Sequence, residues 1–475
     1  MSQNHILLLG LDFGSTTSSA IIIQAIISEQ GIKAVTEFGE EKVLYRSTPV
    51  FTPFNDSKID EVKIHQLLDS WLAESQIAIT NLFAAGVIIT GLAALQSNVE
   101  AIRQLVLQKI PAAAIVAADD PHLESWLAFM GSCATLSRYH AHAKLLNLDI
   151  GGGTTNAAIG ISGNVLTTGC HFIGARHFQF IPGSYQLAEL SRYGVALLAS
   201  LNIHKTLGDA LNASECADIM AFYIKALEAI VLGDSTFFDA PIAKLYEQAS
   251  CPMDAQANPA ITFSGGVGEL VYQLVANQAL PSTTYYGDFG IDLAHAIVAS
   301  PVLSRNLKSH VPENLGRATV YGLALNSTEV SGSSIYLTTS VLTGNAVLPL
   351  RDLPILAKLA IDAPAEAWLN ALKLINQHNK NCALQITHQG NISLNTLKGF
   401  AHMLSAALLK IDWQPMLVLL INGNIGKTLG NYITNWGKHA LHLIVIDEVS
   451  PRDAHFVNLG VMQQGVIPVS FYGLY

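Results

Sequence analysis

One short pattern occurs twice in this chain of 475 residues, and it constrains the fold more than any other feature. Residues 8–20, LLGLDFGSTTSSA, align with residues 145–158, LLNLDIGGGTTNAA, at an offset of 137 residues. Each copy has an apolar strand ending in Asp, a Gly/Ser/Thr turn and a second apolar strand, which predicts a β-hairpin with a polar tip. We interpret the repeat as a duplication rather than a coincidence between two common units. The matching pairs are Leu9/Leu146, Leu11/Leu148, Asp12/Asp149, Gly14/Gly151, Thr17/Thr154 and Ala20/Ala157.

Alternating apolar strands and amphipathic helices follow both hairpins and predict an α/β fold. Beyond about residue 330 the alternation starts again, which indicates a separate C-terminal α/β region. The chain therefore divides into residues 1–143, 144–330 and 331–475, with breaks near 141–145 and 326–331. Strands are expected at 20–27, 86–91, 112–118, 261–266, 333–338, 345–350, 416–421 and 441–447, and helices at 95–110, 122–137, 215–233, 268–280, 365–377 and 397–410.

Composition excludes several classes of protein. The net charge is −10 and the pI near 5.9, and no basic run is present, so we expect no nucleic-acid partner. The mean hydropathy of +0.35 is high, yet the apolar runs are much shorter than the ~20 residues that span a bilayer. The N-terminus lacks the features of a signal peptide, and the five widely spaced cysteines are typical of reduced thiols. We expect a cytoplasmic protein with no membrane partner.

Both hairpin tips have the composition of an anion-binding turn. Glycines allow a ligand to approach the backbone, and successive amide N–H groups at a tight turn bind phosphate, with Ser and Thr hydroxyls as further donors. An acidic residue at each strand end, Asp12 and Asp149, suits a hydrated Mg²⁺ ion beside phosphate oxygens. Two such tips facing each other would hold a polyphosphate from both sides.

A third glycine turn, FSGGVGE at residues 263–269, joins a predicted strand to the start of a helix. Exposed backbone at a helix N-terminus can lie against the base and sugar of a nucleotide. Any one of the three motifs is weak evidence alone, because glycine turns are common. The three motifs together, in this order and at this spacing, are strong evidence for a nucleotide-binding site.

The three motifs resemble those of the actin-like ATPase superfamily, which includes actin, Hsp70-type chaperones and sugar kinases. Residues 10–18 resemble its first phosphate motif, 148–156 its second phosphate motif and 263–269 its adenosine motif. The resemblance implies a duplicated actin-like, ribonuclease H-like α/β core with ATP in the cleft between two domains. Residues 316–325 and 123–131 are similar to its two interdomain connecting helices, with Glu124 in the position of an acidic residue of the first.

Further segments resemble the ethanolamine ammonia-lyase reactivating-factor (EutA) family over nearly the whole chain. That family implies an ATP-dependent, chaperone-like reactivase of adenosylcobalamin-dependent ethanolamine ammonia-lyase, which exchanges damaged cobalamin for intact cofactor. Ethanolamine ammonia-lyase would be the partner, and ATP and Mg²⁺ the cofactors of a weak ATPase. The segments are IITGLAALQSNVEAI, DDPHLES, NLDIGGGTTNAAI, TFSGGVGELVY, RATVYGLAL, VSGSSIYL and INGNIGKTLG.

The resemblance assigns roles to particular residues. Asp12 and Asp149 would hold the hydrated Mg²⁺, and Asp12, Asp149 and Glu124 form the candidate catalytic group, with Asp12 or Glu124 orienting the attacking water. The remaining expected nucleotide-binding residues are Gly14, Ser15, Thr16, Thr17, Gly151, Gly152, Gly153, Thr154 and Thr155 on phosphates, and Ser264, Gly265, Gly266, Val267, Gly268 and Glu269 on adenosine.

Two alternative functions fit the same fold: a small-molecule kinase, and a scaffold that binds nucleotide without turnover.

Three other sequence patterns are weaker evidence for a functional site. GNIGKT (423–428) lacks the first glycine of a P-loop, His140 and His142 lie in a polar stretch that favours a solvated linker, and the D-x-H-x-x-G pattern of cobalamin carriers is absent. The sequence leaves open the partner surface, homo-oligomer formation and enclosure in a bacterial microcompartment.

Overall fold

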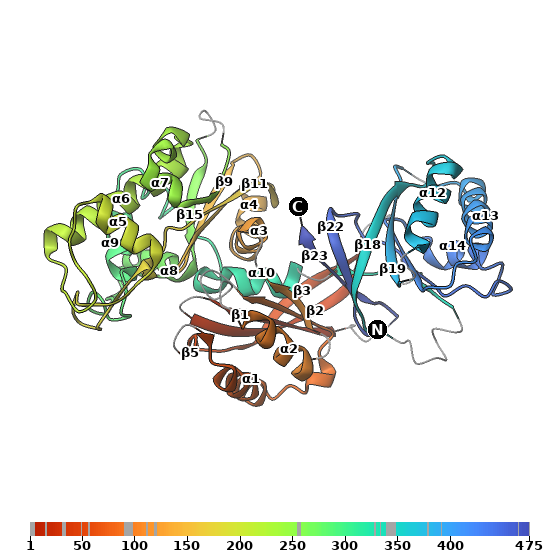
Figure 1. Cartoon of the computed structure of the whole chain (residues 1–475), viewed down its shortest axis with the longest axis horizontal. Helices are drawn as coiled ribbons and strands as arrows, with labels where there is room; N and C mark the ends of the chain where they lie inside the picture. Colours follow the sequence, from red (N-terminus) through yellow and green to blue (C-terminus); the bar gives the residue numbers. More distant parts are fainter. Residues whose placement is uncertain are drawn as a thin grey trace.

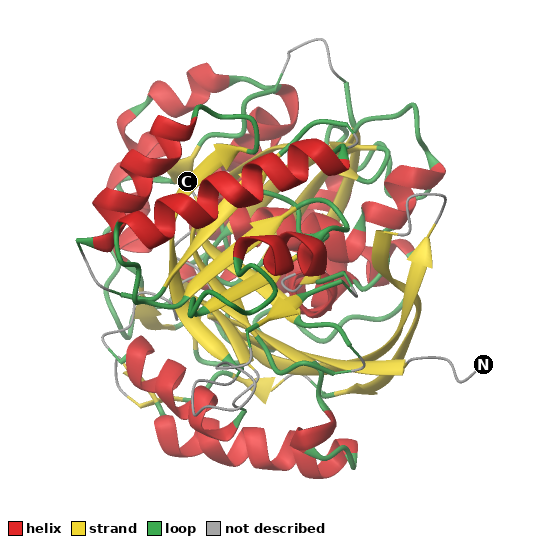
Figure 2. Cartoon of the chain, turned by 90° about the vertical axis from the view of Figure 1, so that its right-hand side faces the viewer, coloured by secondary structure: helices red, strands yellow, loops and turns green. Residues whose placement is uncertain are grey.

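The structure of the chain is a computed structural model, and it has three lobes, each built around one large sheet (Figure 1). The first lobe is drawn in red and orange, the second in yellow and green, and the C-terminal lobe in blue. In the turned view of Figure 2, helices lie outside the strands of the sheets. The described residues are 5–14, 17–30, 35–48, 50–55, 58–89, 98–110, 113–117, 121–253, 258–326, 329–332, 334–338, 348–377, 380–390, 392–463 and 465–474.

The first lobe is built on the first hairpin. Its strands occur in the order β3-β2-β1-β7-β8, with β4 beside the start of β2. The central strand β1 is antiparallel to β2 and parallel to β7, and Leu8, Leu11 and Phe13 on it are buried because both faces of the sheet are covered. The strands are β1 (His5–Phe13), β2 (Thr17–Gln30), β3 (Val35–Arg46), β4 (Val50–Phe51), β7 (Ala84–Ile89) and β8 (Ala113–Ala117), with a small ribbon of β5 (Phe54–Asn55) and β6 (Lys58–Ile59).

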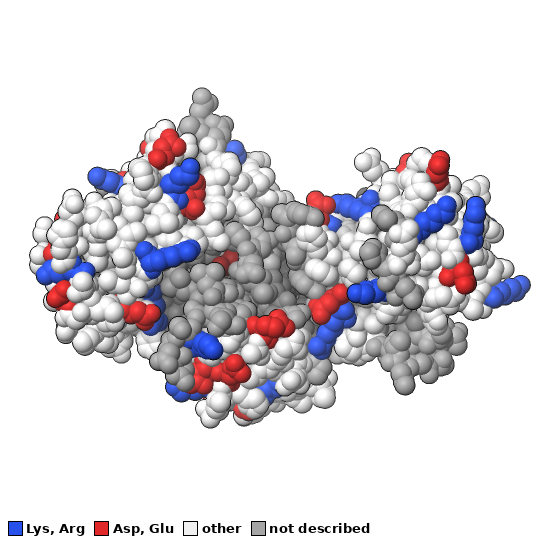
Figure 3. Space-filling view, viewed as in Figure 1, with Lys and Arg blue, Asp and Glu red and all other residues white. Residues whose placement is uncertain are grey.

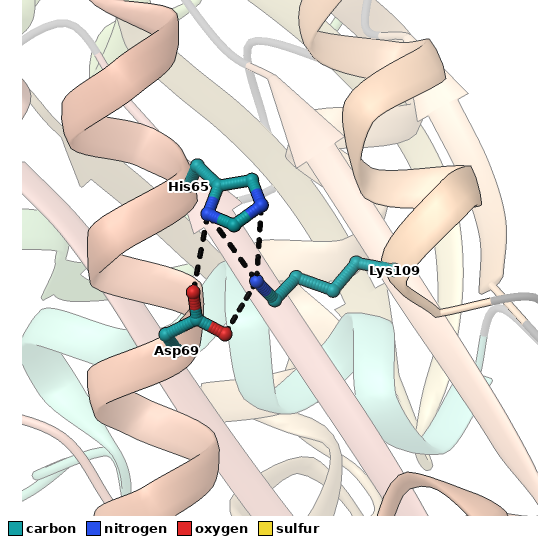
Figure 4. A network of polar contacts seen from close by, with 3 residues as sticks. All are labelled: His65, Asp69 and Lys109. Carbon is teal, nitrogen blue, oxygen red and sulfur yellow. Dashed lines mark hydrogen bonds and ion pairs between the residues drawn. The ribbon is translucent and has the colours of Figure 1, made fainter.

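Two helices of the first lobe, α1 (Glu61–Ser75) and α2 (Val99–Lys109), are joined by a polar network (Figure 4). The Asp69 carboxylate pairs with Lys109 of α2 and lies 3.1 Å from Nδ1 of His65, one turn earlier on α1. The hydrogen bond from Lys109 lowers the pKa of the Asp69 carboxyl below its usual value. Because the Asp69 carboxylate is exposed to solvent, the network adds little to stability.

The second lobe repeats this arrangement around the second hairpin, with strand order β14-β11-β10-β9-β15. Its long helix α6 begins with a capping box of Asn212 and Glu215 and ends at Gly233, whose φ is 67°. The elements are β9 (Leu145–Ile150), β10 (Thr155–Ile161), β11 (Asn164–His171), β12 (Phe178–Phe180), β13 (Leu187–Leu190), β14 (Glu247–Ala249), β15 (Ala260–Ser264), α5 (Arg192–Ser200), α6 (Ala213–Leu232), α7 (Pro241–Leu245), α8 (Gly265–Val275) and α9 (Gly290–Ala299).

The two hairpins have the same register as well as the same sequence pattern. Asp12 lies opposite Ser19 in the first hairpin, and Asp149 lies opposite Asn156 in the second. Both pairs of positions are related by the offset of 137 residues. Each tip closes with the same backbone hydrogen bond, from Gly14 N–H to the Thr17 carbonyl (3.0 Å) and from Gly151 N–H to the Thr154 carbonyl (2.9 Å). The internal repeat therefore extends to the hydrogen bonds of the backbone.

Two helices cross between the lobes, and each packs on the sheet that it does not follow in sequence. The helix α3 (Pro121–Ser132) comes after the first sheet but packs on β9, β10 and β11, whereas α10 (Ala318–Asn326) comes after the second sheet and packs on β1, β2 and β7. The helices approach so closely that a Cβ atom on Gly322 would overlap the carbonyl oxygen of Leu127. This exchange ties the two lobes together at one crossing.

The C-terminal lobe has an eight-stranded sheet in the order β16-β23-β22-β18-β19-β20-β21-β17, with β18 to β21 parallel. It docks on the first lobe, where Val466 packs in a buried cluster with Ile6 and Phe83, and Gln463 donates to the Leu82 carbonyl (3.1 Å). Its elements are β16 (Glu329–Val330), β17 (Tyr336–Leu337), β18 (Leu350–Ala360), β19 (Cys382–Thr387), β20 (Leu417–Ile421), β21 (Leu443–Ile446), β22 (Ala454–Leu459), β23 (Pro468–Leu474), α12 (Ala365–Asn376), α13 (Leu394–Lys410) and α14 (Gly426–Ile433).

Several expected elements differ from those observed. The helix expected at 122–137 is divided at Cys133 into α3 and α4 (Ala134–Tyr139). The helix expected at 268–280 ends at Val275, because Asn277 takes a left-handed φ of 56°. Half of the strand expected at 345–350, residues 345–347, lies outside the described residues, and β18 begins at Leu350. Strands β19, β22 and β23 carry no strong period-two pattern and were not predicted.

The fold is an α/β duplicated actin-like core with an added C-terminal α/β region. The core is defined by the equivalent hairpins, the matching strand orders and the crossed helices between the lobes. Within the described part of the chain, no helix has the length and apolar character needed to cross a bilayer. The division at 1–143, 144–330 and 331–475 stays a prediction.

The helix crossing predicts opposite effects for two Gly-to-Ala substitutions in helices. Gly322→Ala should destabilise the protein by about 1–3 kcal/mol, because the added methyl group forces α3 and α10 apart. Gly399→Ala on α13, where a Cβ atom meets nothing within 4 Å, should stabilise it by up to about 1 kcal/mol. Urea unfolding of both variants measures the difference, and equal stabilities would contradict the close crossing.

Candidate functional site

A cleft of about 320 Å³ lies between the first and second lobes, where the tips of both hairpins meet. Its walls come from the ends of β1 and β9, from α3, from the N-terminal turns of α8 and α9, and from the start of α10. Figure 3 shows one face of the molecule, on which Lys and Arg side chains are dispersed among acidic ones.

Most residues predicted from the sequence line this cleft. They are Asp12, Gly14, Thr17, Glu124, Asp149, Gly151, Gly152, Gly153, Thr154, Gly265, Gly266, Val267 and Glu269. Ser15 and Thr16 lie outside the described residues.

Three predicted residues are described but are not among those lining the cleft. The Thr155 hydroxyl donates to the Ile173 carbonyl (2.7 Å), and the Ser264 hydroxyl donates to Asp149. Gly268 is buried against Phe263. Thr155 is the first residue of β10 and its hydroxyl is bound to the Ile173 carbonyl, whereas Thr154 lies in the turn before β10 and lines the cleft.

A chain of buried hydrogen bonds holds the Asp149 side chain. The Ser264 hydroxyl donates to Oδ2 of Asp149 (2.6 Å) and accepts from the Asn147 amide (2.8 Å). The Asn147 oxygen in turn accepts from the Thr262 hydroxyl (3.1 Å). Because β9 and β15 are neighbouring parallel strands, these side chains meet at one edge of the sheet and fix the direction of the carboxylate.

Burial disfavours the ionised forms of two carboxyl groups in the cleft, those of Asp149 and Glu124. Burial raises the pKa of Asp149 to about 6, although the hydrogen bond from Ser264 opposes the shift. Glu124 on α3 has its pKa raised well above the usual value, first by burial and then by the charges of Asp149 and Asp12. Both aspartates are thus close enough to Glu124 to disfavour its ionised form.

The donor set fits a hydrated divalent cation rather than a fully protein-bound metal. Within the described residues, no three His, Cys, Asp or Glu side chains are grouped so that they could hold a metal by themselves. Mg²⁺ keeps several waters and binds through one or two carboxylates and phosphate oxygens. Asp149 and Asp12 line the same cleft, and a cation beside them would offset the cost of burying Asp149.

The first turn of α8 forms another wall of the cleft. Gly265 has a φ of 78°, and a Cβ atom there would lie 2.5 Å from the Ile150 carbonyl oxygen, so the turn requires glycine. Gly266 faces open space, and Glu269 and Gln273, one helical turn apart, line the cleft beyond it. The exposed backbone and the polar side chains give this wall donors and acceptors for a ligand.

Sequence reasoning missed several cleft residues. Asp288 is buried, and its carboxylate accepts a hydrogen bond from Gly290 N–H (2.8 Å) at the start of α9. The Arg317 side chain donates to the Ser47 carbonyl (2.6 Å). The buried Nε of Arg317 has no hydrogen-bond partner among the described residues. The tripeptide Asp288-Phe289-Gly290 repeats Asp12-Phe13-Gly14, a signal that was available in the sequence. The other missed residues are Ala175, Leu270, Gln273, Tyr286, Gly316, Ala318 and Thr319.

One contact bridges the first and second lobes beside the hairpin tips. The Arg176 guanidinium, in the segment after β11, lies 5.9 Å from the ring centroid of Phe51 on β4. β4 pairs with Thr17 and Ser18 of the first hairpin. The contact therefore joins structures attached to both hairpins.

Comparison with known proteins identifies the family. The model of the family described as "Ethanolamine utilisation protein EutA" matches residues 4–474. The chain belongs to the EutA family. Two curated relatives, from Salmonella typhimurium and Escherichia coli, are each named "Ethanolamine ammonia-lyase reactivase EutA" and are 26% identical to this EutA-family chain, covering 100% of it and 99% of the relative.

Two solved structures are similar to this EutA-family chain at low sequence identity. A Ppx/GppA family member from Aquifex aeolicus is 14% identical with a TM-score of 0.34, covering 68% of this chain and 88% of that one. The ethanolamine utilization protein EutJ from Carboxydothermus hydrogenoformans is 16% identical with a TM-score of 0.29, covering 67% and 89%.

The structure shows what surrounds two of the weaker sequence patterns, the GNIGKT turn at 423–428 and His140. The P-loop-like turn precedes α14, where Gly426 N–H donates to Asp447 (3.2 Å) and Lys427 N–H donates to the Ser334 carbonyl. The first amides of that helix are thus occupied by the chain itself. The His140 ring lies 4.6 Å from the His310 ring, which places it against the second lobe.

The raised pKa of Asp149 predicts that its carboxylate destabilises the ligand-free protein. The pKa of Asp149 is about 6 in the folded protein, above the value in the unfolded chain. The contribution of this side chain to the free energy of unfolding is therefore fully present below pH 4 and is lost as pH rises through 6. Asp149→Asn should therefore be more stable than the wild type above pH 6, by up to about 3 kcal/mol, with little difference at pH 4. Denaturant unfolding across pH tests this, and a pH-independent difference would contradict it.

The two neighbouring glycines of α8 predict separable effects. Gly265→Ala should lower stability by about 1–3 kcal/mol, because its backbone is left-handed and the methyl group meets the Ile150 carbonyl. Gly266→Leu should leave stability nearly unchanged but fill the cleft, weakening the expected ATP binding more than tenfold. Thermal unfolding and calorimetric titration measure the two effects, and ATP affinity unchanged in Gly266→Leu would exclude this wall from the nucleotide site.

Proposed function

We propose that the cleft binds Mg²⁺–ATP, with the phosphates between the two hairpin tips and the adenosine beside the first turn of α8. The observation that carries the proposal is the pair of hairpins with the same register, whose glycine tips and strand-end carboxylates line one cleft. Backbone amides at such tips bind phosphate, and carboxylates beside them suit a hydrated cation.

The catalytic group of this proposal comprises Asp12, Asp149 and Glu124. Bound Mg²⁺ would neutralise phosphate charge, while Asp12 and Asp149 hold its water shell. Glu124 orients the attacking water, since α3 places it at the same cleft with a pKa raised by burial and by both aspartates. The backbone amides of the tips stabilise charge that develops on the phosphate oxygens.

We further propose that ATP turnover drives reactivation of ethanolamine ammonia-lyase, the activity in the names of the curated relatives. Binding of ATP between the lobes would draw them together, and hydrolysis would release them. Because the C-terminal lobe is docked on the first lobe through Val466 and Gln463, it would move with that lobe relative to the second. The movement would open the partner so that damaged cobalamin leaves and adenosylcobalamin enters.

The decisive variant is Asp149→Asn, which keeps the size of the side chain and removes its charge. ATP turnover should fall by about ten- to a thousandfold, because a charged contact in the transition state is lost, while ATP binding persists through the amide donors. The variant should also fail to restore activity to ethanolamine ammonia-lyase inactivated by damaged cobalamin. Phosphate release and recovered lyase activity are the two measurements.

A matched control exists in the C-terminal lobe. Asp447 also follows a buried strand, and burial likewise raises its pKa to about 6, but it caps α14 rather than lining the cleft. Asp447→Asn should leave turnover unchanged. Full reactivation by an Asp149→Asn protein that no longer hydrolyses ATP would favour the scaffold, and phosphate transfer to a small-molecule acceptor would favour the kinase.

A further inference from the structure

The phosphate loop of the second hairpin, Gly151–Gly153, is held from behind by one short segment, Ala175–His177. Ala175 N–H donates to the Gly151 carbonyl (3.2 Å), and Arg176 N–H donates to the Gly152 carbonyl (2.6 Å). Nε2 of His177 lies 2.9 Å from the Gly153 carbonyl oxygen. Three successive carbonyl groups of the loop are thus bound by three successive residues.

This arrangement determines where the amide groups of the loop point. In a planar trans peptide the N–H of the next residue points opposite to the carbonyl. When the three carbonyls are turned toward the 175–177 segment, the N–H groups of Gly152, Gly153 and Thr154 are turned away from it. Those residues line the cleft, so their N–H groups form the inner surface of an anion-binding turn.

His177 is the member of this segment that acts through its side chain, and its ring is fixed on every side. It is fully buried, its Nδ1 lies 2.8 Å from the Ser191 hydroxyl, and the rings of Tyr193 and Tyr246 pack against it with centroids 5.1 and 6.0 Å away. A carbonyl can only accept, so Nε2 carries the proton and Nδ1 accepts from Ser191. Burial lowers the pKa of His177 to about 4, which keeps the ring neutral in this form.

We propose that His177 is a positioning residue for phosphate binding: its Nε2–H holds the Gly153 carbonyl out of the cleft and so presents the loop amides to the ligand. The inference rests on the proposed function, because it requires that the cleft binds phosphate. Without the donor, the Gly153 carbonyl would be buried without a partner and could rotate into the cleft, where its partial negative charge repels a phosphate.

A second histidine of the same lobe provides a matched control. His171, at the end of β11, is equally buried, and burial also lowers its pKa to about 4. Its ring packs on Phe238, with centroids 4.9 Å apart, and its Nδ1 has no hydrogen-bond partner among the described residues. A general effect of removing a buried imidazole should therefore appear in both His171→Asn and His177→Asn.

The experiment compares ADP and adenosine binding by calorimetry in the full chain. The side chain of Asn reaches the position of Nδ1 and that of Gln the position of Nε2, so His177→Asn loses the donor to Gly153 and His177→Gln keeps it. We expect ADP affinity to fall about tenfold in His177→Asn with adenosine affinity unchanged, and to recover largely in His177→Gln. His171→Asn should leave the ratio of the two affinities at the wild-type value.

The outcomes separate the inference from the function on which it rests. An unchanged ratio of ADP to adenosine affinity in folded His177→Asn, or an equal loss in the Gln variant, would overturn the role of His177 while leaving nucleotide binding intact. A wild-type chain that binds neither ligand would overturn the proposed function and this inference together. If His177→Asn does not fold, Ser191→Ala, which frees the ring at Nδ1, should show a smaller loss confined to ADP, and no loss would count against the proposal.

Discussion

The rest of the site depends on three carboxyl groups that the fold brings to one cleft, two of them buried. Asp12 and Asp149 end equivalent strands of the duplicated core, and α3 adds Glu124 beside them. Burial opposes the ionisation of Asp149 and Glu124, and the charges of Asp149 and Asp12 raise the pKa of Glu124 further, so the ligand-free protein carries a local cost in stability. Such a cost is typical of sites organised around a ligand of opposite charge, here the proposed hydrated cation.

The helix crossing makes this concentration of charge possible. Because α3 packs on the second sheet and α10 on the first, each lobe is anchored to a helix that leads out of the other. The strand ends of both sheets are thereby brought to one cleft. The absence of a side chain at Gly322 allows the helices to approach within backbone contact, and a wider crossing would separate the two hairpin tips.

The two hairpin tips are also linked to each other by direct contacts of the chain. The Thr52 hydroxyl donates to the Gly14 carbonyl (2.6 Å), the neighbouring Phe51 lies under Arg176, and Arg176 N–H donates to Gly152. Since Phe51 belongs to the first lobe and Arg176 to the second, a change in the angle between the lobes must alter this contact. If the proposed function holds, the first lobe would carry the docked C-terminal lobe with it when it moves relative to the second lobe. A small movement at the bound phosphates would then become a large displacement of the C-terminal lobe.

The sequence by itself determined what depends on local pattern: the α/β class, the two hairpins, their polar tips and the glycine turn before α8. It also placed most residues of the cleft, because the duplicated motif marks the same strand end in both lobes. It did not distinguish Thr154, which lies in the hairpin turn and lines the cleft, from Thr155, which begins β10 and donates its hydroxyl to the Ile173 carbonyl. Only the tertiary structure decided that Asp288 and Arg317 join the cleft, that His177 binds the Gly153 carbonyl, and that Asp149 and Glu124 have raised pKa values. Those properties arise from contacts between residues far apart in the chain and from burial by a second lobe. The residues next to a position in the sequence indicate neither its long-range contacts nor its burial.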